Sequence, residues 1–302
     1  MEQYLIGKII KEFRLRNNFS QEKLVGTTCA ISTLSRIENG DQIPNRKLVE
    51  ALFSKMGIEA PLHAVPMSNT DLERWNLEYE IEESIVHKNY EIQALLEKYH
   101  TLGPELNVLE QQFYIFYTAI YSIHHNGNFE KNLFQLEKAR QLTMKKYIRN
   151  KQAYPGILTE IECLIIHAIA VVFYNLKHIN IAICILKFLM RYFESHTISE
   201  NKKENDYTTI LYTLSTWLYS DGQYTEALSV SEKGIKVCIS YGLLTLFPCL
   251  LFNKGICLHQ LGQEEIGKKI INHSLLFMCE LGKHDEAVVC AKKIKEKFNL
   301  DI

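Results

Sequence analysis

Five side chains between residues 21 and 36 carry hydrogen-bonding groups suited to nucleic acid. They are an amide, three hydroxyls and a guanidinium, contributed by Gln21, Ser32, Thr33, Ser35 and Arg36. Such groups can reach base edges in a major groove or the phosphate oxygens beside it. For Arg36, a bidentate contact with guanine and a simple phosphate contact are equally open.

Short helices must position these groups. Apolar spacing and helix-end residues predict four of them, over residues 4–17, 21–26, 32–38 and 46–56. Ser20 supplies a capping oxygen for the second helix, and Gly40 and Gly57 can adopt the left-handed conformation that ends the third and fourth. A tight connection between the second and third helices is typical of a helix-turn-helix. The start of the second helix would then present backbone N–H groups and Gln21 to a phosphate, and the third would enter the major groove.

Charge is distributed unevenly along the chain. The whole chain of 302 residues has a net charge of −1, but residues 1–58 hold nine Lys and Arg against six Asp and Glu. A basic N-terminal segment on a mildly acidic remainder fits contact with nucleic acid, although the excess is small. Leu34 and Ile37 of the third helix are predicted to lie in the core. A helical adaptor that binds no DNA is the alternative.

The motif at residues 20–24, the motif at residues 34–40 and Pro44 resemble the Cro and phage-repressor helix-turn-helix family. The resemblance implies that Glu38 pairs with Arg14 of the first helix and clamps the segment without touching DNA. The turn over residues 26–31 departs from the family, because it is one residue shorter than the commonest form and lacks the usual glycine.

Residues 71–302 are predicted to be helical almost throughout. They follow a boundary at residues 59–70, which contains two prolines and small polar residues. Breaks recur between amphipathic stretches, at residues 88–90, 127–129, 177–179, 222–224 and 262–264. Around the fourth break, Tyr224 would fill the turn and Ala227 would lie where two helices touch. These stretches resemble degenerate tetratricopeptide repeats, with about five helical hairpins and a closing helix over residues 284–298.

The predicted fold is therefore all-α: an N-terminal helix-turn-helix followed by a right-handed superhelix of repeats. The first helix of each hairpin would line a concave wall that can hold an extended peptide. Thr213 and Asn253 could bond a peptide backbone, and Lys88 or Lys254 could bind a terminal carboxylate. The other candidates on these helices are His167, Tyr212 and Thr216. A solvated face or core packing is the alternative for each of them.

The whole chain resembles the peptide-pheromone receptors of Gram-positive bacteria, the Rap–Rgg–NprR–PlcR–PrgX group, and within it the PlcR-like members. The resemblance implies a DNA-binding domain at residues 1–60, a linker at 61–70 and a peptide-binding and dimerisation domain at 71–302. It also implies a cytoplasmic homodimer that binds a short signalling peptide and an inverted-repeat operator, with activation favoured over repression. The groove positions that match the family are Lys88, His167, Thr213 and Asn253. The family often has Asn where His167 and Thr213 stand here, and Gln where Asn253 stands.

Catalytic and cofactor motifs are missing from the sequence: no phosphate-binding glycine loop, HExxH zinc motif or recognisable nucleophile set occurs. No cofactor, metal or enzymatic activity is therefore expected. The eight cysteines form no CxxC pair and are expected to be reduced thiols, and no membrane span is expected. The competing function is a helix-turn-helix repressor whose repeats only dimerise or dock a protein.

Overall fold

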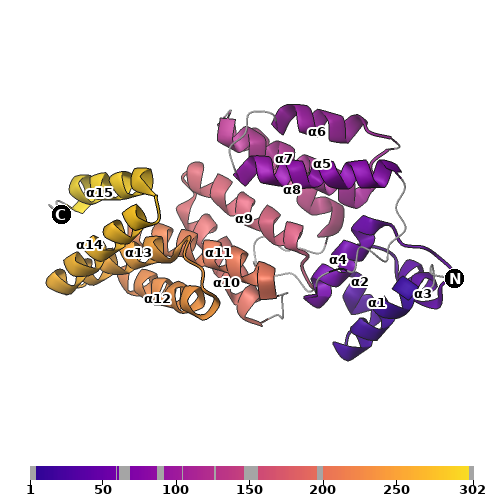
Figure 1. Ribbon diagram of the computed structural model, residues 1–302, viewed down its shortest axis with the longest axis horizontal. Helices are drawn as coiled ribbons and strands as arrows, with labels where there is room; N and C mark the ends of the chain where they lie inside the picture. Colours follow the sequence, from indigo (N-terminus) through magenta and orange to yellow (C-terminus); the bar gives the residue numbers. More distant parts are fainter. Residues whose placement is uncertain are drawn as a thin grey trace. The chain divides into compact units, whose positions relative to one another are not determined.

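The computed structural model describes residues 5–58, 60, 69–86, 92–103, 105–125, 127–145, 156–195 and 200–298. All regular elements within these ranges are helices, which confirms the predicted all-α repeat fold (Figure 1). The chain divides into two compact units: Met1–Leu189 with Ser195–Ser199, and Met190–Glu194 with Glu200–Ile302. Residues 61–68 of the expected linker and the expected break at 88–90 lie outside the described residues.

The first unit begins with four short helices, α1 (Leu5–Arg16), α2 (Gln21–Val25), α3 (Ile31–Asn39) and α4 (Arg46–Met56). Their bounds agree with the predicted helices to within about one residue. Ser20 caps α2 by accepting a hydrogen bond from the backbone N–H of Lys23, at 3.0 Å. Gly40 and Gly57 end α3 and α4 in the left-handed conformation, as expected. An apolar core that includes Ile10, Leu34, Ile37, Leu52 and Phe53 joins these four helices.

The first unit continues with α5 (Asn69–Val86), α6 (Ile92–Thr101), α7 (Val108–His125), α8 (Phe129–Thr143), α9 (Glu160–Asn175) and most of α10 (Ile179–Ser195). Packing runs between chain neighbours, with α6 against both α5 and α7, and α8 against both α7 and α9.

The second unit contains the end of α10, then α11 (Glu200–Ser220), α12 (Tyr224–Tyr241), α13 (Phe247–Gln260), α14 (Glu264–Glu280) and α15 (His284–Phe298). α11 also packs directly against α13, so the first helices of successive hairpins are neighbours. Ala227 is completely buried. Gly222 and Gly262 adopt positive φ at their turns, where a residue with a side chain would be strained.

One backbone contact fixes how α3 lies against α1. A Cβ atom added at Gly7 of α1 would lie 1.9 Å from the carbonyl oxygen of Ile37 in α3. Only glycine therefore allows these two helices to approach at backbone level. Since backbone cannot move aside as a side-chain tip can, α3 is held in one position relative to α1.

We predict that Gly7→Ala lowers the free energy of unfolding by about 1–3 kcal/mol, despite the better helix propensity of alanine. Urea denaturation followed by circular dichroism measures this. Gly234→Ala in α12 is the control, because the added Cβ would meet the flexible end of the Leu250 side chain, 2.8 Å from Cδ2. Equal stability of the wild type and Gly7→Ala would show that the two helices separate easily.

Candidate functional site

The outer face of α3 carries the side chains predicted to contact nucleic acid. Ser32 and Arg36 are exposed, and Thr33 and Ser35 are half-buried. Leu34 and Ile37, on the inner face, are buried in the core as expected. The helix thus separates a packing face from a face of hydroxyls and one guanidinium.

A buried cluster of polar groups lies beneath this outer face. Arg14 of α1 donates to both carboxylate oxygens of Glu38, with distances of 2.6 Å from Nε to Oε1 and 2.9 Å from Nη2 to Oε2. Arg14 Nη1 also donates to the carbonyl oxygen of Phe19, at 2.8 Å. One side chain therefore links α1, the connection before α2 and the end of α3.

Gln21 joins the same cluster, which the sequence did not indicate. Its Nε2 donates to Glu38 Oε2 at 2.8 Å, so the amide predicted to meet a phosphate holds the carboxylate of α3 in this structure. Burial raises the pKa of Glu38, but the hydrogen bonds from Arg14 and Gln21 outweigh it and hold the pKa below its ordinary value. Glu38 is therefore an ionised carboxylate with its partners in place.

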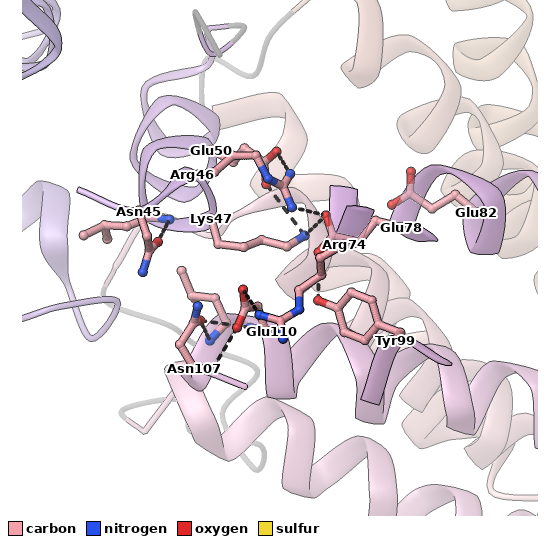
Figure 2. A network of polar contacts seen from close by, with 12 residues as sticks. Asn45, Arg46, Lys47, Glu50, Arg74, Glu78, Glu82, Tyr99, Asn107 and Glu110 are labelled. Atoms are coloured by element: carbon pink, nitrogen blue, oxygen red, sulfur yellow. Dashed lines mark hydrogen bonds and ion pairs between the residues drawn. The ribbon is translucent and has the colours of Figure 1, made fainter. Parts of the chain in front are cut away.

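A second polar network connects α4 to α5, α6 and α7 (Figure 2). Glu78 of α5 accepts hydrogen bonds from Arg46 and from the Tyr99 hydroxyl, the latter at 2.7 Å, and pairs with Lys47 at 2.9 Å. Arg46 and Glu78 are both buried. One carboxylate therefore ties α4 to α5 and α6.

The network continues through a second ion pair. Arg74 of α5 donates to Glu110 of α7, with 3.1 Å between Nη1 and Oε1. Sequence reasoning missed both pairs, because their members lie more than 30 positions apart. The only indication in the sequence was the pair of adjacent cations Arg46 and Lys47, which need acidic partners if they are buried.

The groove candidates of the second unit lie mainly on α11 and α13. Asn253 is buried, and its Nδ2 donates to Ser215 Oγ at 2.8 Å and to Thr216 Oγ1 at 2.9 Å. Tyr212 and Thr216 are four residues apart on α11 and so lie on one face of it, and burial raises the Tyr212 pKa to about 12. The structure therefore brings Tyr212, Thr216 and Asn253 together, with half-buried Thr213 on the same helix.

The remaining groove candidates differ in their surroundings. Lys254 pairs with Glu232 of α12, at 2.8 Å between Nζ and Oε1, so its ammonium faces the preceding hairpin. His167 lies on α9 in the first unit, and its Nε2 is buried without a hydrogen-bond partner. Burial lowers the His167 pKa to about 4, which leaves the ring neutral at neutral pH. Lys88 lies outside the described residues.

Lys293 of α15, which was not predicted from the sequence, contacts the polar face of α11 that carries Tyr212 and Thr216. Lys293 of α15 donates to the hydroxyl of Tyr219 at 2.5 Å and lies 4.8 Å from the centre of that ring. Tyr212, Thr216 and Tyr219 are spaced four and three residues apart, so they share one face of α11.

Among the described residues, no group of three His, Cys, Asp or Glu side chains could hold a metal ion. No described helix is long and apolar enough to cross a membrane. All eight cysteines are free.

Comparison with known proteins agrees with the repeat architecture. A family model described as the RNPP family C-terminal domain matches residues 79–298. No curated protein is similar enough in sequence to be matched.

Similar solved structures include Bacillus thuringiensis PlcR in complex with the peptide PapR7 and DNA, with 21% identity and a TM-score of 0.60 over 96% of this chain and 99% of that one. The apo form of the same protein has 19% identity and a TM-score of 0.61 over the same shares. The apo competence regulator ComR from Streptococcus vestibularis has 15% identity and a TM-score of 0.54, over 98% of this chain and 99% of that one. At these identities the likeness shows the fold.

We predict that Arg14→Ala destabilises the N-terminal helices by about 3–5 kcal/mol, because the Glu38 carboxylate would stay buried without its main partner. Urea unfolding of the full chain measures the loss. Since the Glu38 pKa lies below its ordinary value of 4.5, the carboxylate stabilises the fold above that pH and loses its contribution as pH falls through the lowered pKa. The difference between wild type and variant should therefore shrink in acid.

Arg16→Ala is the matched control for this prediction. Arg16 lies on the same helix but pairs with Glu12 at the surface, where both side chains are mostly exposed. Such a pair stabilises by less than about 1 kcal/mol. An Arg14→Ala protein as stable as Arg16→Ala would contradict the prediction.

Proposed function

Because this chain belongs to the RNPP family, we propose that it is a peptide-responsive transcription regulator. In this proposal, residues 1–60 form a helix-turn-helix DNA-binding domain and residues 71–302 a peptide-binding and dimerisation domain, joined by a linker at 61–70. The observation that carries it is the family match over residues 79–298, behind four helices that expose a polar face on α3. The PlcR likeness over 96% of the chain supports placing it among PlcR-like members.

The proposed DNA contacts are those of α3. Ser32, Thr33, Ser35 and Arg36 would face the major groove, while Arg14, Gln21 and Glu38 hold the helix in place. A second N–H of the Gln21 amide could still reach a phosphate beside the start of α2. The solved PlcR complex contains DNA, which supports this assignment.

The proposed peptide contacts of the second unit are Tyr212, Thr213, Thr216 and Asn253. His167, on α9 of the first unit, is proposed from the resemblance. Hydroxyls and an amide on first helices suit the backbone of an extended peptide. Lys254 is a weaker candidate for a terminal carboxylate, because the ammonium would have to leave Glu232. Lys88 is proposed to bind the terminal carboxylate from the resemblance alone. A neutral His167 ring would form one hydrogen bond with the peptide.

As a regulator, the chain would act in the cytoplasm as a homodimer on an inverted repeat. Peptide and DNA binding would be linked, so that each strengthens the other by the same factor. By likeness to PlcR, we propose activation.

We predict that in vitro selection from random DNA with the full chain yields an inverted repeat, and that Arg36→Ala weakens binding to it by about 1–3 kcal/mol. Fluorescence anisotropy over a range of salt concentrations measures this. Loss of preference at one base pair would indicate a guanine contact, and uniform weakening with a smaller salt slope a phosphate contact. Lys138→Ala, which removes an exposed cation on α8, is the control. Unchanged affinity of Arg36→Ala would refute the proposed reading face.

We predict that a synthetic peptide encoded by a short reading frame beside the gene binds with measurable heat, and that Thr213→Val reduces its affinity about fivefold. The substitution removes one hydroxyl and keeps the shape of the side chain. Thr225→Val, at an exposed position on α12, is the control. If no such peptide binds to folded protein, the peptide-responsive part of the proposal fails and the DNA-binding part stands.

A further inference from the structure

Lys55 of α4 is a charged side chain in a place where charge is costly. It is only 1% exposed, and its Nζ donates to the carbonyl oxygen of Val25, the last residue of α2, at 2.9 Å. Burial lowers its pKa, while the negative charge of Glu162 acts to raise it. A buried ammonium destabilises a fold unless its partners compensate for lost hydration.

The carbonyl that Lys55 contacts does not depend on it for a hydrogen bond. Val25 O also accepts from the backbone N–H of Thr28, at 2.8 Å. In the connection between α2 and α3, Cys29 packs against the core, but the hydroxyls of Thr27 and Thr28 are buried without hydrogen-bond partners. Lys55 therefore adds a second hydrogen bond to the carbonyl at which this connection begins.

The same turn of α4 also contacts the start of α9. Ser54 Oγ accepts a hydrogen bond from the backbone N–H of Glu160, at 3.0 Å. Two residues on, Glu162 is fixed by hydrogen bonds from Thr143 Oγ1 at 2.6 Å and from the Thr159 N–H at 2.7 Å. Two hydrogen bonds therefore hold the Glu162 carboxylate on α9, and its charge acts to raise the Lys55 pKa.

Helix α9 also carries His167, about one and a half turns beyond Glu162. The chain of contacts runs from α9 through Ser54 and Lys55 to Val25, where the connection into α3 begins. All of these residues belong to the first unit.

We propose that Lys55 is a positioning residue for α3, and that Ser54 and Lys55 form the point at which α9 acts on the α2–α3 turn. A shift of α9 would reach the DNA-reading helix through α4 without passing through the linker at 61–70. This inference rests on the proposed DNA-binding function.

The test compares Lys55→Met, Ser54→Ala and the control Lys98→Met, which alters an exposed lysine on α6, with the wild-type full chain. Methionine keeps the length and apolar stem of lysine, and the Val25 carbonyl keeps its bond from Thr28. We expect Lys55→Met to melt at or above the wild-type temperature. A buried charge is removed, and Glu162, unlike Glu38 in Arg14→Ala, keeps its hydrogen bonds from Thr143 and Thr159. The affinity of Lys55→Met for the selected operator should nevertheless fall about fivefold. If Lys55 were needed only for stability, the variant would lose operator affinity only when its melting temperature also fell.

Hydrogen exchange followed by mass spectrometry tests the link to α9. Ser54→Ala should speed exchange of the amides at residues 26–30 as well as at 160–162, and Lys98→Met should change neither. Wild-type affinity of Lys55→Met, or loss of affinity only in step with a lower melting temperature, would overturn the positioning role. Exchange confined to residues 160–162 in Ser54→Ala would overturn the link. If the wild type selects no DNA, the proposed function fails, and the exchange data alone decide on the link.

Discussion

The buried charges of α4 are the constraint on which the first unit depends. Arg46 and Lys55, near opposite ends of an 11-residue helix, are both almost completely removed from water. Each would cost several kcal/mol alone, so each needs partners that only other helices can supply. Arg46 finds Glu78 on α5, and Lys55 finds a carbonyl on α2 and the charge of Glu162 on α9. Helix α4 therefore makes polar contacts both with the N-terminal helices and with the helices that follow them.

This arrangement changes how a ligand signal would travel. The boundary predicted at residues 59–70 suggests separate N-terminal and repeat domains, yet α4 bonds directly to α5 through Arg46 and to α9 through Ser54. Within the first unit, the route between α9 and the reading helix is then a set of packed helices with fixed polar contacts. Such a route transmits small displacements, since neither backbone nor buried ion pairs can stretch far without breaking.

Much of the fold could be predicted because its signals are local. Ser20, Gly40 and Gly57 set helix ends through their own backbone neighbours, and Ala227 and Gly222 mark a hairpin within a few residues. The polar contacts of α4 could not be predicted, because apolar periodicity assigns Arg46 and Lys55 to solvent and gives no register between distant helices. Lys254 shows the same limit on α13: its ion pair with Glu232 of α12 could not be predicted from the sequence, and its ligand contact stays a prediction.

The backbone contact at Gly7 has a consequence for how such proteins diversify. With α1 and α3 touching through main-chain atoms, the inner face of α3 has no room for new side chains, whereas Ser32 and Arg36 stand outside that contact. Substitutions on the outer face are therefore free of the demands of packing. Single substitutions on this face could therefore change which DNA sequence is preferred in related proteins, while the packing of the helices stays unchanged.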